Sequence, residues 1–213
     1  NTGVEDAMDR PKVSISMGRK TGVKTTILEA AKALFARYGF KKTAVDEIAR
    51  RARVGKATIY AHFASKEEVF AAAVRESGRQ LLDRLRAAVA EQQEPAAKVR
   101  AFIETRMSRI REQGTLHPMS EETLSELLPM AARAREEFFW QEVDLLEAVL
   151  AEGQAGGAFR MSHPRRVALT MLSAAQGIDM TFLKMKQTPE LEEGIGEMID
   201  LLLAGLAARR HPG

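Results

Sequence analysis

The chain has 213 residues, a formal net charge of +3 and no cysteine. This length allows one large domain or two small ones, and the lack of cysteine excludes disulfide and thiol chemistry and agrees with a reducing, cytoplasmic location. No apolar run approaches the about 18 residues that a membrane span needs, and residues 1–16 lack the apolar core of a secretory signal. We therefore expect a cytoplasmic protein with no membrane partner.

The composition predicts an all-α fold. Alanine, leucine, glutamate and arginine dominate the sequence, and β-branched runs are missing. We expect about nine helices in three parts. Residues 1–24 form a flexible basic leader, residues 25–66 a helix-turn-helix DNA-binding domain, and residues 67–213 a helical domain for ligand binding and dimerisation.

The charges differ between the two ends of the chain. Residues 1–66 contain 14 Lys and Arg against 6 Asp and Glu, whereas the remaining residues contain 18 against 23. A basic N-terminal part followed by an acidic remainder indicates that only the N-terminal part binds a polyanion. A chance run of solvated charges would give the same numbers. The charge pattern therefore supports DNA binding only in combination with the helix-turn-helix motif described below.

The first predicted helix runs from Thr26 to Tyr38. Its apolar stripe includes Ile27, Leu34 and Phe35, and Gly39 supplies the C-terminal stop. We expect this helix to pack across the two short helices that follow and to complete a three-helix unit.

Residues 43–63 predict two short helices joined by a tight turn. Thr43 and Asp46 have the spacing of a capping pair, and Ile48 and Ala52 lie on the narrow apolar face of the first short helix. Gly55 is an acceptable N-cap for the second helix. Small and hydroxyl side chains make this second helix slim enough for the DNA major groove, which is about 12 Å wide.

Eight residues are the candidates for contact with DNA. They are Thr43, Gly55, Lys56, Ala57, Thr58, Tyr60, His62 and Lys66. Lysine and hydroxyl groups donate to phosphates, and glycine and alanine allow close approach of the backbone. The alternative for Tyr60 is a half-buried packing residue. The alternative for Gly55 and Ala57 is a role in helix packing only.

The same stretch resembles the DNA-binding signature of the TetR family of bacterial regulators. The match extends from Thr25 to Phe70 and comprises Thr43, Ile48, Ala49, Ala52, Val54, Thr58, Tyr60, His62, Phe63, Lys66 and Glu67. Arg53 replaces the usual turn glycine, Gly55 the usual serine cap, and Ala57 a common glycine. A non-glycine residue with positive φ is uncommon, so we expect the turn geometry at Arg53 to differ from that of the family.

The rest of the chain predicts longer helices. Ser65 and Glu68 form a capping box that opens a helix from residue 66 to about residue 92. Five further helices are expected over residues 95–112, 119–128, 131–152, 164–184 and 189–209, with a break at Pro129.

The last two helices carry more apolar surface than one helix face needs. In proteins that this chain resembles, they pair with their copies in a four-helix dimer interface. The interface residues implied in this way are Leu172, Ala175, Ile178, Met198 and Leu202. The alternative is that both helices belong to the core of one subunit.

The rear domain is rich in methionine, which suits adaptable binding surfaces. We expect Phe102, Met107 and Phe138 to line a cavity for an apolar or amphipathic molecule. The polar residues expected to orient it are Arg106, Gln176 and Asp179. Ordinary core filling explains any one of these residues equally well.

The sequence contains no recognisable catalytic or cofactor motif. The four histidines lack partners at metal-ligand spacing, and G-x-S-x-G, P-loop and G-x-G-x-x-G patterns do not occur. We therefore expect no enzyme activity, no cofactor and no metal.

These features predict a ligand-responsive, sequence-specific regulator of transcription. Most proteins that the chain resembles are repressors, so we expect a repressor. It would bind a palindromic operator as a homodimer and be released by a small apolar or amphipathic effector. Two alternatives remain open. One is an architectural DNA binder without sequence preference. The other is a helical enzyme or carrier in which the N-terminal helix-turn-helix has no part in the activity.

Overall fold

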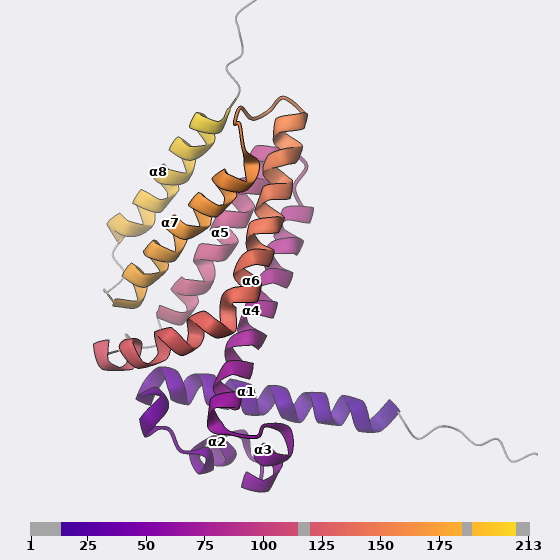
Figure 1. Ribbon diagram of the computed structural model, residues 1–213, viewed down its shortest axis with the longest axis vertical. Helices are drawn as coiled ribbons and strands as arrows, with labels where there is room; N and C mark the ends of the chain where they lie inside the picture. The colour runs from indigo at the N-terminus through magenta and orange to yellow at the C-terminus, as the bar shows by residue number, and fades with distance from the viewer. Residues whose placement is uncertain (1–13, 115–119, 185–188, 208–213) are drawn as a thin grey trace, which may run out of the picture.

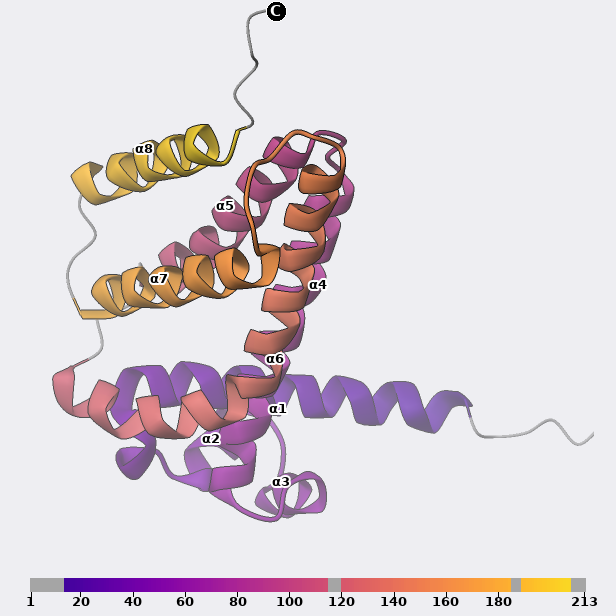
Figure 2. The ribbon, with the colours of Figure 1, turned by 45° about the horizontal axis from the view of Figure 1, so that its top comes forward.

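The computed structural model describes residues 14–114, 120–184 and 189–207, which fold into eight helices (Figure 1 and Figure 2). In chain order they are α1 (Ser14–Lys42), α2 (Val45–Ala52), α3 (Lys56–His62), α4 (Lys66–Ala90), α5 (Pro95–Gly114), α6 (Glu121–Ala155), α7 (Pro164–Lys184) and α8 (Pro189–Leu206). Over these ranges the chain forms no strand, although an isolated bridge joins Phe159 to Ala207. The all-α prediction is confirmed. None of the described helices is both long and apolar enough to cross a membrane.

Two of the predicted helices form one helix, which explains why the described residues contain eight helices rather than about nine. We expected a break at Pro129, but α6 passes through that proline. A proline removes one backbone hydrogen bond and kinks a helix without always ending it, and α6 is bent in Figure 2. Side chains of α6 enter two different cores, one near each end, and this packing holds the helix together. Met119, the expected start of the separate helix, lies outside the described residues.

The first core belongs to a compact unit that we call the head, formed by α1, α2, α3 and the start of α4. Its largest buried side chains are Ile27, Leu28, Leu34, Phe35, Ile48, Ile59, Phe63, Val69 and Phe70. The rings of Phe35, Phe40 and Phe70 meet one another with centroids 5.3 to 5.9 Å apart. Leu127 of α6, only 7% exposed, belongs to the same core. The head is therefore completed by a residue far along the chain.

The helix α1 is longer than the sequence predicted and is interrupted at Gly39. Gly39 has φ 79° and ψ 172°, so the expected stop is confirmed there, although three more residues are assigned to α1. Positive φ is readily adopted by glycine alone. At its other end α1 begins at Ser14 instead of Thr26, so part of the expected leader is helical. Residues 1–13 lie outside the described part of the chain.

The second core lies in the unit that we call the body, formed by the rest of α4 together with α5 to α8. Its largest buried side chains are Leu81, Leu85, Phe102, Met107, Leu146, Leu150, Phe159, Leu172 and Ile199. The helix α4 passes through both cores, because Val69 and Phe70 lie in the head while Leu81 and Leu85 lie in the body. Its 25 residues are capped as predicted, since the Glu68 amide donates to Ser65 Oγ.

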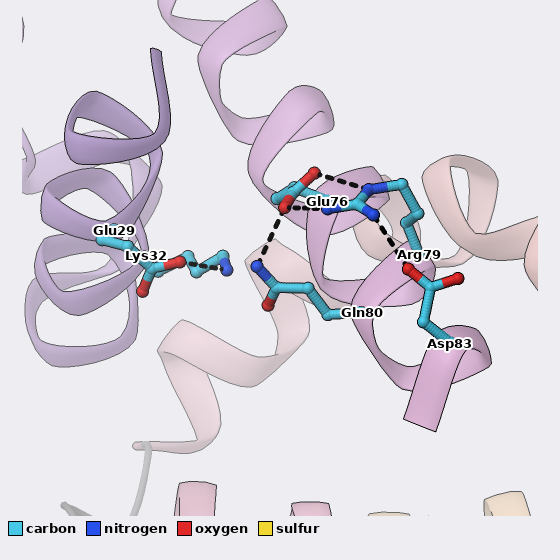
Figure 3. A network of polar contacts seen from close by, with 6 residues as sticks. All are labelled: Glu29, Lys32, Glu76, Arg79, Gln80 and Asp83. Carbon is cyan, nitrogen blue, oxygen red and sulfur yellow. Dashed lines mark hydrogen bonds and ion pairs between the residues drawn. The ribbon is translucent and has the colours of Figure 1, made fainter. Parts of the chain in front are cut away.

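Charged side chains from α1 and α4 face each other where the head meets the body (Figure 3). On α4, the Glu76 carboxylate accepts hydrogen bonds from Arg79 Nη2 at 2.7 Å and from Gln80 Nε2 at 2.9 Å. On α1, Lys32 Nζ donates to Glu29 at 2.7 Å. The hydrogen bond from Arg79 holds the pKa of Glu76 below its ordinary value, with a smaller contribution from the charge of Lys32.

The helices α4 and α6 approach closely at Gly78. A Cβ atom added at Gly78 would lie 2.6 Å from Cδ2 of Phe138, far inside van der Waals contact. Glycine in a helix interior costs about 1 kcal/mol relative to alanine, and here the missing side chain makes room for the Phe138 ring. Phe138 thus packs directly against the backbone of the helix that joins head to body.

Candidate nucleic-acid interface and effector site

The N-cap of the first short helix, α2, is Ala44, one residue later than the expected Thr43. The Ala44 amide donates to Glu47 Oε2 at 3.1 Å. The predicted pairing of Thr43 with Asp46 is therefore wrong, because Glu47 stands at the N3 position and accepts from the N-cap amide, while the Ala44 side chain has no acceptor. The glutamate partner usual in capping boxes is present after all, shifted by one residue.

The Thr43 side chain faces the inside of the head. Thr43 is 1% exposed, and its hydroxyl donates to the Gly39 carbonyl at 2.7 Å. This bond gives a side-chain donor to the carbonyl of the residue at which α1 is interrupted. The hydroxyl cannot reach a phosphate from this position. A DNA contact of Thr43 would have to use its backbone amide, near the start of α2.

The turn between α2 and α3 contains the only described non-glycine residue with positive φ. Arg53 has φ 56° and ψ 41° and forms the C-cap of α2, where its amide donates to the Arg50 carbonyl at 3.2 Å. The residue occupies the left-handed region in which glycine is normally favoured. Arg53 therefore takes the backbone conformation that glycine adopts most readily, at a cost in backbone strain.

Replacing Arg53 by glycine should relieve this strain. We expect Arg53→Gly to raise the free energy of unfolding by about 1 kcal/mol, since a non-glycine left-handed residue costs about 1–2 kcal/mol and the entropy of the unfolded chain offsets part of it. Urea unfolding followed by circular dichroism measures the change. Arg51→Gly, within the helix α2, is the matched control and should destabilise. An unchanged or lower stability for Arg53→Gly would show that the turn is not strained.

The helix α3 displays its small and polar residues on the outer surface of the head. Lys56, Ala57 and Tyr60 are exposed, Tyr60 by 49%, whereas Ile59 is 1% exposed and anchors the helix in the head core. Thr58 and His62 are half-buried at the edges of this face. Gly55 is the N-cap, as predicted, with its carbonyl accepting from the Thr58 amide at 2.9 Å. An exposed helix with small side chains on its outer face fits the major groove, which admits an α-helix.

An ion pair holds the first lysine of this face. Lys56 Nζ lies 3.0 Å from Asp46 Oδ2, and both side chains are more than half exposed, at 52% and 64%. The hydrogen bond to Asp46 is the largest cause that raises the pKa of Lys56. Lys56 is therefore charged, and a DNA phosphate must compete with Asp46 for it.

Removing the carboxylate of Asp46 should strengthen DNA binding. We expect Asp46→Asn to tighten binding to all duplexes by about two- to fivefold, because an exposed ion pair is weak and a negative charge near the phosphates is lost. Fluorescence anisotropy at two salt concentrations measures the effect. Asp83→Asn, which removes an arginine partner on α4, serves as the control and should leave affinity unchanged. Equal or weaker binding of Asp46→Asn would place this face away from DNA.

The Lys66 side chain is used within the head. Its Nζ donates to the carbonyls of Phe40 at 2.8 Å and Thr43 at 3.1 Å, and lies 4.3 Å from the centre of the Phe40 ring. An ammonium group has three N–H donors, so two are occupied by the chain itself. Lys66 therefore ties the end of α1 to the start of α4, and we assign it first a structural role.

The residues expected to bind a ligand are only partly brought together. Phe102, Arg106, Met107 and Asp179 lie in the body core, whereas Phe138 is half-buried against Gly78 and Gln176 is exposed.

Sequence reasoning missed Glu142, which is 0% exposed and bonds to Arg106. Its signal was present, since Glu142 lies one turn after Phe138 and one turn before Leu146 on the apolar face of α6.

Three charges from three helices meet in the body core. Arg106 of α5 donates from Nε to Glu142 Oε2 of α6 at 3.0 Å, and from Nη1 to Asp179 Oδ1 of α7 at 3.1 Å. Burial raises the pKa of Asp179, against the opposing effect of the Arg106 charge. Arg135 of α6 approaches from the surface, with Nη2 3.7 Å from Glu142 Oε1. Within the described ranges, no three His, Asp or Glu side chains form a metal-binding group.

The residues expected at a dimer interface have different exposures. Leu202 is 36% exposed and its neighbour Leu201 is 74% exposed. Ala175, Ile178 and Met198 are half-buried. Leu172, 1% exposed, packs in the core of its own subunit, so we leave it out of the proposed interface.

Known proteins share both the head and the whole fold. Residues 27–73 match the family described as bacterial regulatory proteins, tetR family. The chain is 29% identical over 191 residues to YhgD of Bacillus subtilis, an uncharacterized HTH-type transcriptional regulator, covering 87% of this chain and 97% of that protein. Over 44 residues it is 48% identical to the A-factor receptor protein of Streptomyces griseus, which covers 21% of this chain and 16% of that protein.

A solved structure shows the same architecture. The transcriptional regulator FadR from Bacillus subtilis, in complex with stearoyl-CoA, has a TM-score of 0.71 with 22% identity, covering 85% of this chain and 98% of that chain. Identity at this level shows a shared fold. The family match over the helix-turn-helix, the similarity to YhgD along most of the chain and this common architecture identify the chain as a member of the TetR family of bacterial transcriptional regulators.

Proposed function

We propose that the protein binds a palindromic DNA operator as a homodimer, represses transcription there, and releases the DNA when a small apolar or amphipathic effector binds in the body. This work would take place in the cytoplasm, where bacterial DNA lies. The observation that carries the proposal is the outer face of α3, with Lys56, Ala57 and Tyr60 exposed while Ile59 fixes the helix to the head core.

The contacts follow from the exposures on this face. Ala57 and the Gly55 backbone are small enough to approach base edges. Lys56, Tyr60, Thr58 and His62 carry donors for phosphates, which position a protein on the duplex. Exposed Arg50 and Arg51, in the last turn of α2, add positive charge to the head. We assign Thr43 and Lys66 supporting roles, because their side chains bond to the head itself.

A homodimer is supported by the apolar surface of α8. Two-fold proteins place their recognition helices about 34–36 Å apart, one turn of DNA, and the same surface patch must then serve both subunits. Leu201 and Leu202 leave such a patch open beside half-buried Met198.

A charge in this patch should separate the subunits. We expect Leu202→Glu to give monomers in sedimentation equilibrium and to weaken operator binding, because two buried carboxylates would face each other at the interface. Ala204→Glu is the matched control, since Ala204 is exposed and lies at helical spacing from exposed Glu197 and Asp200. A persistent Leu202→Glu dimer would place the interface elsewhere.

An effector site in the body is supported by the buried charged group and by the relatives. The FadR structure contains stearoyl-CoA, and the A-factor receptor is named for its ligand. The effector acts only through its preference for the state that does not bind DNA, a coupling typically worth about 1–3 kcal/mol.

Footprinting on the DNA that flanks the gene tests the proposal. We expect protection of a palindromic site, with affinity for that site well above the affinity for a random duplex of equal length at each of two salt concentrations. Equal affinities would favour the architectural alternative. Catalytic turnover retained after loss of DNA binding by the variant Ala57→Glu would favour the enzyme alternative.

A further inference from the structure

The buried charged group of Arg106, Glu142 and Asp179 leaves two atoms without a hydrogen bond. Arg106 Nη2 and Glu142 Oε1 have no hydrogen-bond partner, although the two side chains are 2% and 1% exposed. Buried polar atoms in folded proteins are nearly always hydrogen-bonded. One of these atoms is a donor and the other an acceptor, and they belong to side chains that already bond to each other at 3.0 Å.

The charges around these two atoms disfavour a charged ligand group. A carboxylate would accept from Arg106 Nη2 but would meet the like charges of Glu142 and Asp179. An ammonium group would donate to Glu142 Oε1 but would meet the charge of Arg106 and leave Nη2 unpaired. A neutral group that both donates and accepts, such as a hydroxyl or a carboxamide, satisfies both atoms without adding charge.

Apolar side chains flank the cluster along α5 and α6. Phe102 lies one helical turn before Arg106, and Leu146 one turn after Glu142, both 0% exposed. Arg135, with its side chain 33% exposed, approaches Glu142 Oε1 to 3.7 Å. A ligand that displaced the Arg135 side chain would meet this oxygen, with its remaining atoms among hydrocarbon groups.

We infer that the effector is an apolar molecule bearing a neutral hydroxyl or carboxamide group, which accepts from Arg106 Nη2 and donates to Glu142 Oε1. This inference rests on the proposed function, because it names the chemistry of the effector assigned there to the body. It gives Glu142, rather than the exposed Gln176, the role of reading the polar end of the ligand.

Four probes with one eight-carbon chain test the inference on the full-length protein without DNA. The probes are octanol, octanamide, octanoate and octylamine at neutral pH. Binding is measured by thermal shift and by the fluorescence of Trp140, which is the only tryptophan and lies two residues before Glu142. Octanol and octanamide should bind at least about tenfold more tightly than octanoate and octylamine, because only the neutral groups pair both atoms. Equal binding of all four probes, or no binding of the neutral pair, would overturn the inference.

Variants in which an amide replaces a carboxylate give a second test. A cluster with a purely structural role would not change the order of the probes in these variants. In Glu142→Gln, one negative charge is lost and octanoate should gain about tenfold relative to octanol. Glu147→Gln, at a half-buried position of α6 where the carboxylate pairs with Arg165, is the control and should keep the original order of probes. Asp179→Asn should shift the order in the same direction and serves if Glu142→Gln does not fold. An unchanged order in a folded variant would overturn the inference.

Failure here is distinguishable from failure of the proposed function. Probe binding is measured without DNA, whereas the proposed function is tested by protection of a palindromic site. A protein that orders the probes as expected but protects no operator would refute the regulator and keep the binding site.

Discussion

Arg106→Ala should lower the free energy of unfolding by about 3–5 kcal/mol, the usual cost of removing one partner from a buried ion pair. The guanidinium compensates two carboxylates that have little access to water, since Glu142 is 0% exposed and Asp179 is 7% exposed. Without it, both carboxylates remain in the body core with only Arg135 nearby. Urea unfolding at neutral pH, followed by circular dichroism, measures the loss.

The neighbouring pair on the same helix provides the control for this prediction. Arg100 of α5 bonds to Asp200 and lies 3.6 Å from Glu104, but its side chain is 38% exposed. Arg100→Ala should therefore cost no more than about 1 kcal/mol, as for most surface ion pairs. Equal losses for the two variants would mean that Arg106 is in effect solvated and that the cluster does not hold α5, α6 and α7 together.

Ala57→Glu should abolish specific DNA binding. The side chain at position 57 lies on the exposed face of α3, and a carboxylate there would meet the phosphates. Like charges brought together cost several kcal/mol, which corresponds to about a hundredfold or more in affinity. Glutamate in the first turn of a helix is favourable for the helix itself, so the fold should persist. Anisotropy with a labelled operator measures the loss.

A second alanine tests whether the effect depends on place. Ala87 is exposed on α4, in the body rather than the head, and Ala87→Glu adds the same charge to the protein. It should leave operator affinity within about twofold of the parent, because screening removes the effect of charges more than about 10 Å away. A comparable loss in Ala87→Glu would show that net charge, and not position on α3, decides binding.

The local patterns of the head were readable from sequence because each has a short-range cause. Gly39 takes the positive φ expected of a helix stop, Ser65 caps α4, and Gly55 caps α3. Ile48 and Ala52 occupy the core, as their spacing predicted. Capping and periodicity depend on neighbours within about one helical turn, so a single sequence contains the necessary information.

The roles of Thr43 and Lys66 could not be read in the same way. The Thr43 hydroxyl bonds to Gly39, and Lys66 reaches the carbonyl of Phe40, 26 residues earlier in the chain. These contacts exist only once α1 and α4 are packed together. The family pattern marks both positions without saying whether they serve DNA or the fold.

Long-range packing also explains the errors in the rear of the chain. Pro129 ends many helices, but α6 continues because Leu127 lies in the head core and Val143 in the body core. Glu142 resembles a surface residue in composition, yet Arg106 from another helix makes its burial tolerable. Neither fact follows from a local pattern.

The place of Leu127 has a consequence for protein engineering. The sequence suggests that the first 66 residues could be exchanged between regulators to combine the DNA target of one with the inducer of another. In this protein Leu127 fills the head core, and Glu126 accepts a hydrogen bond from the Lys41 amide. A transplanted head would lack both and would expose apolar surface to water. A working chimera should carry the first turns of α6 with it, or a host helix with an apolar residue at the same place.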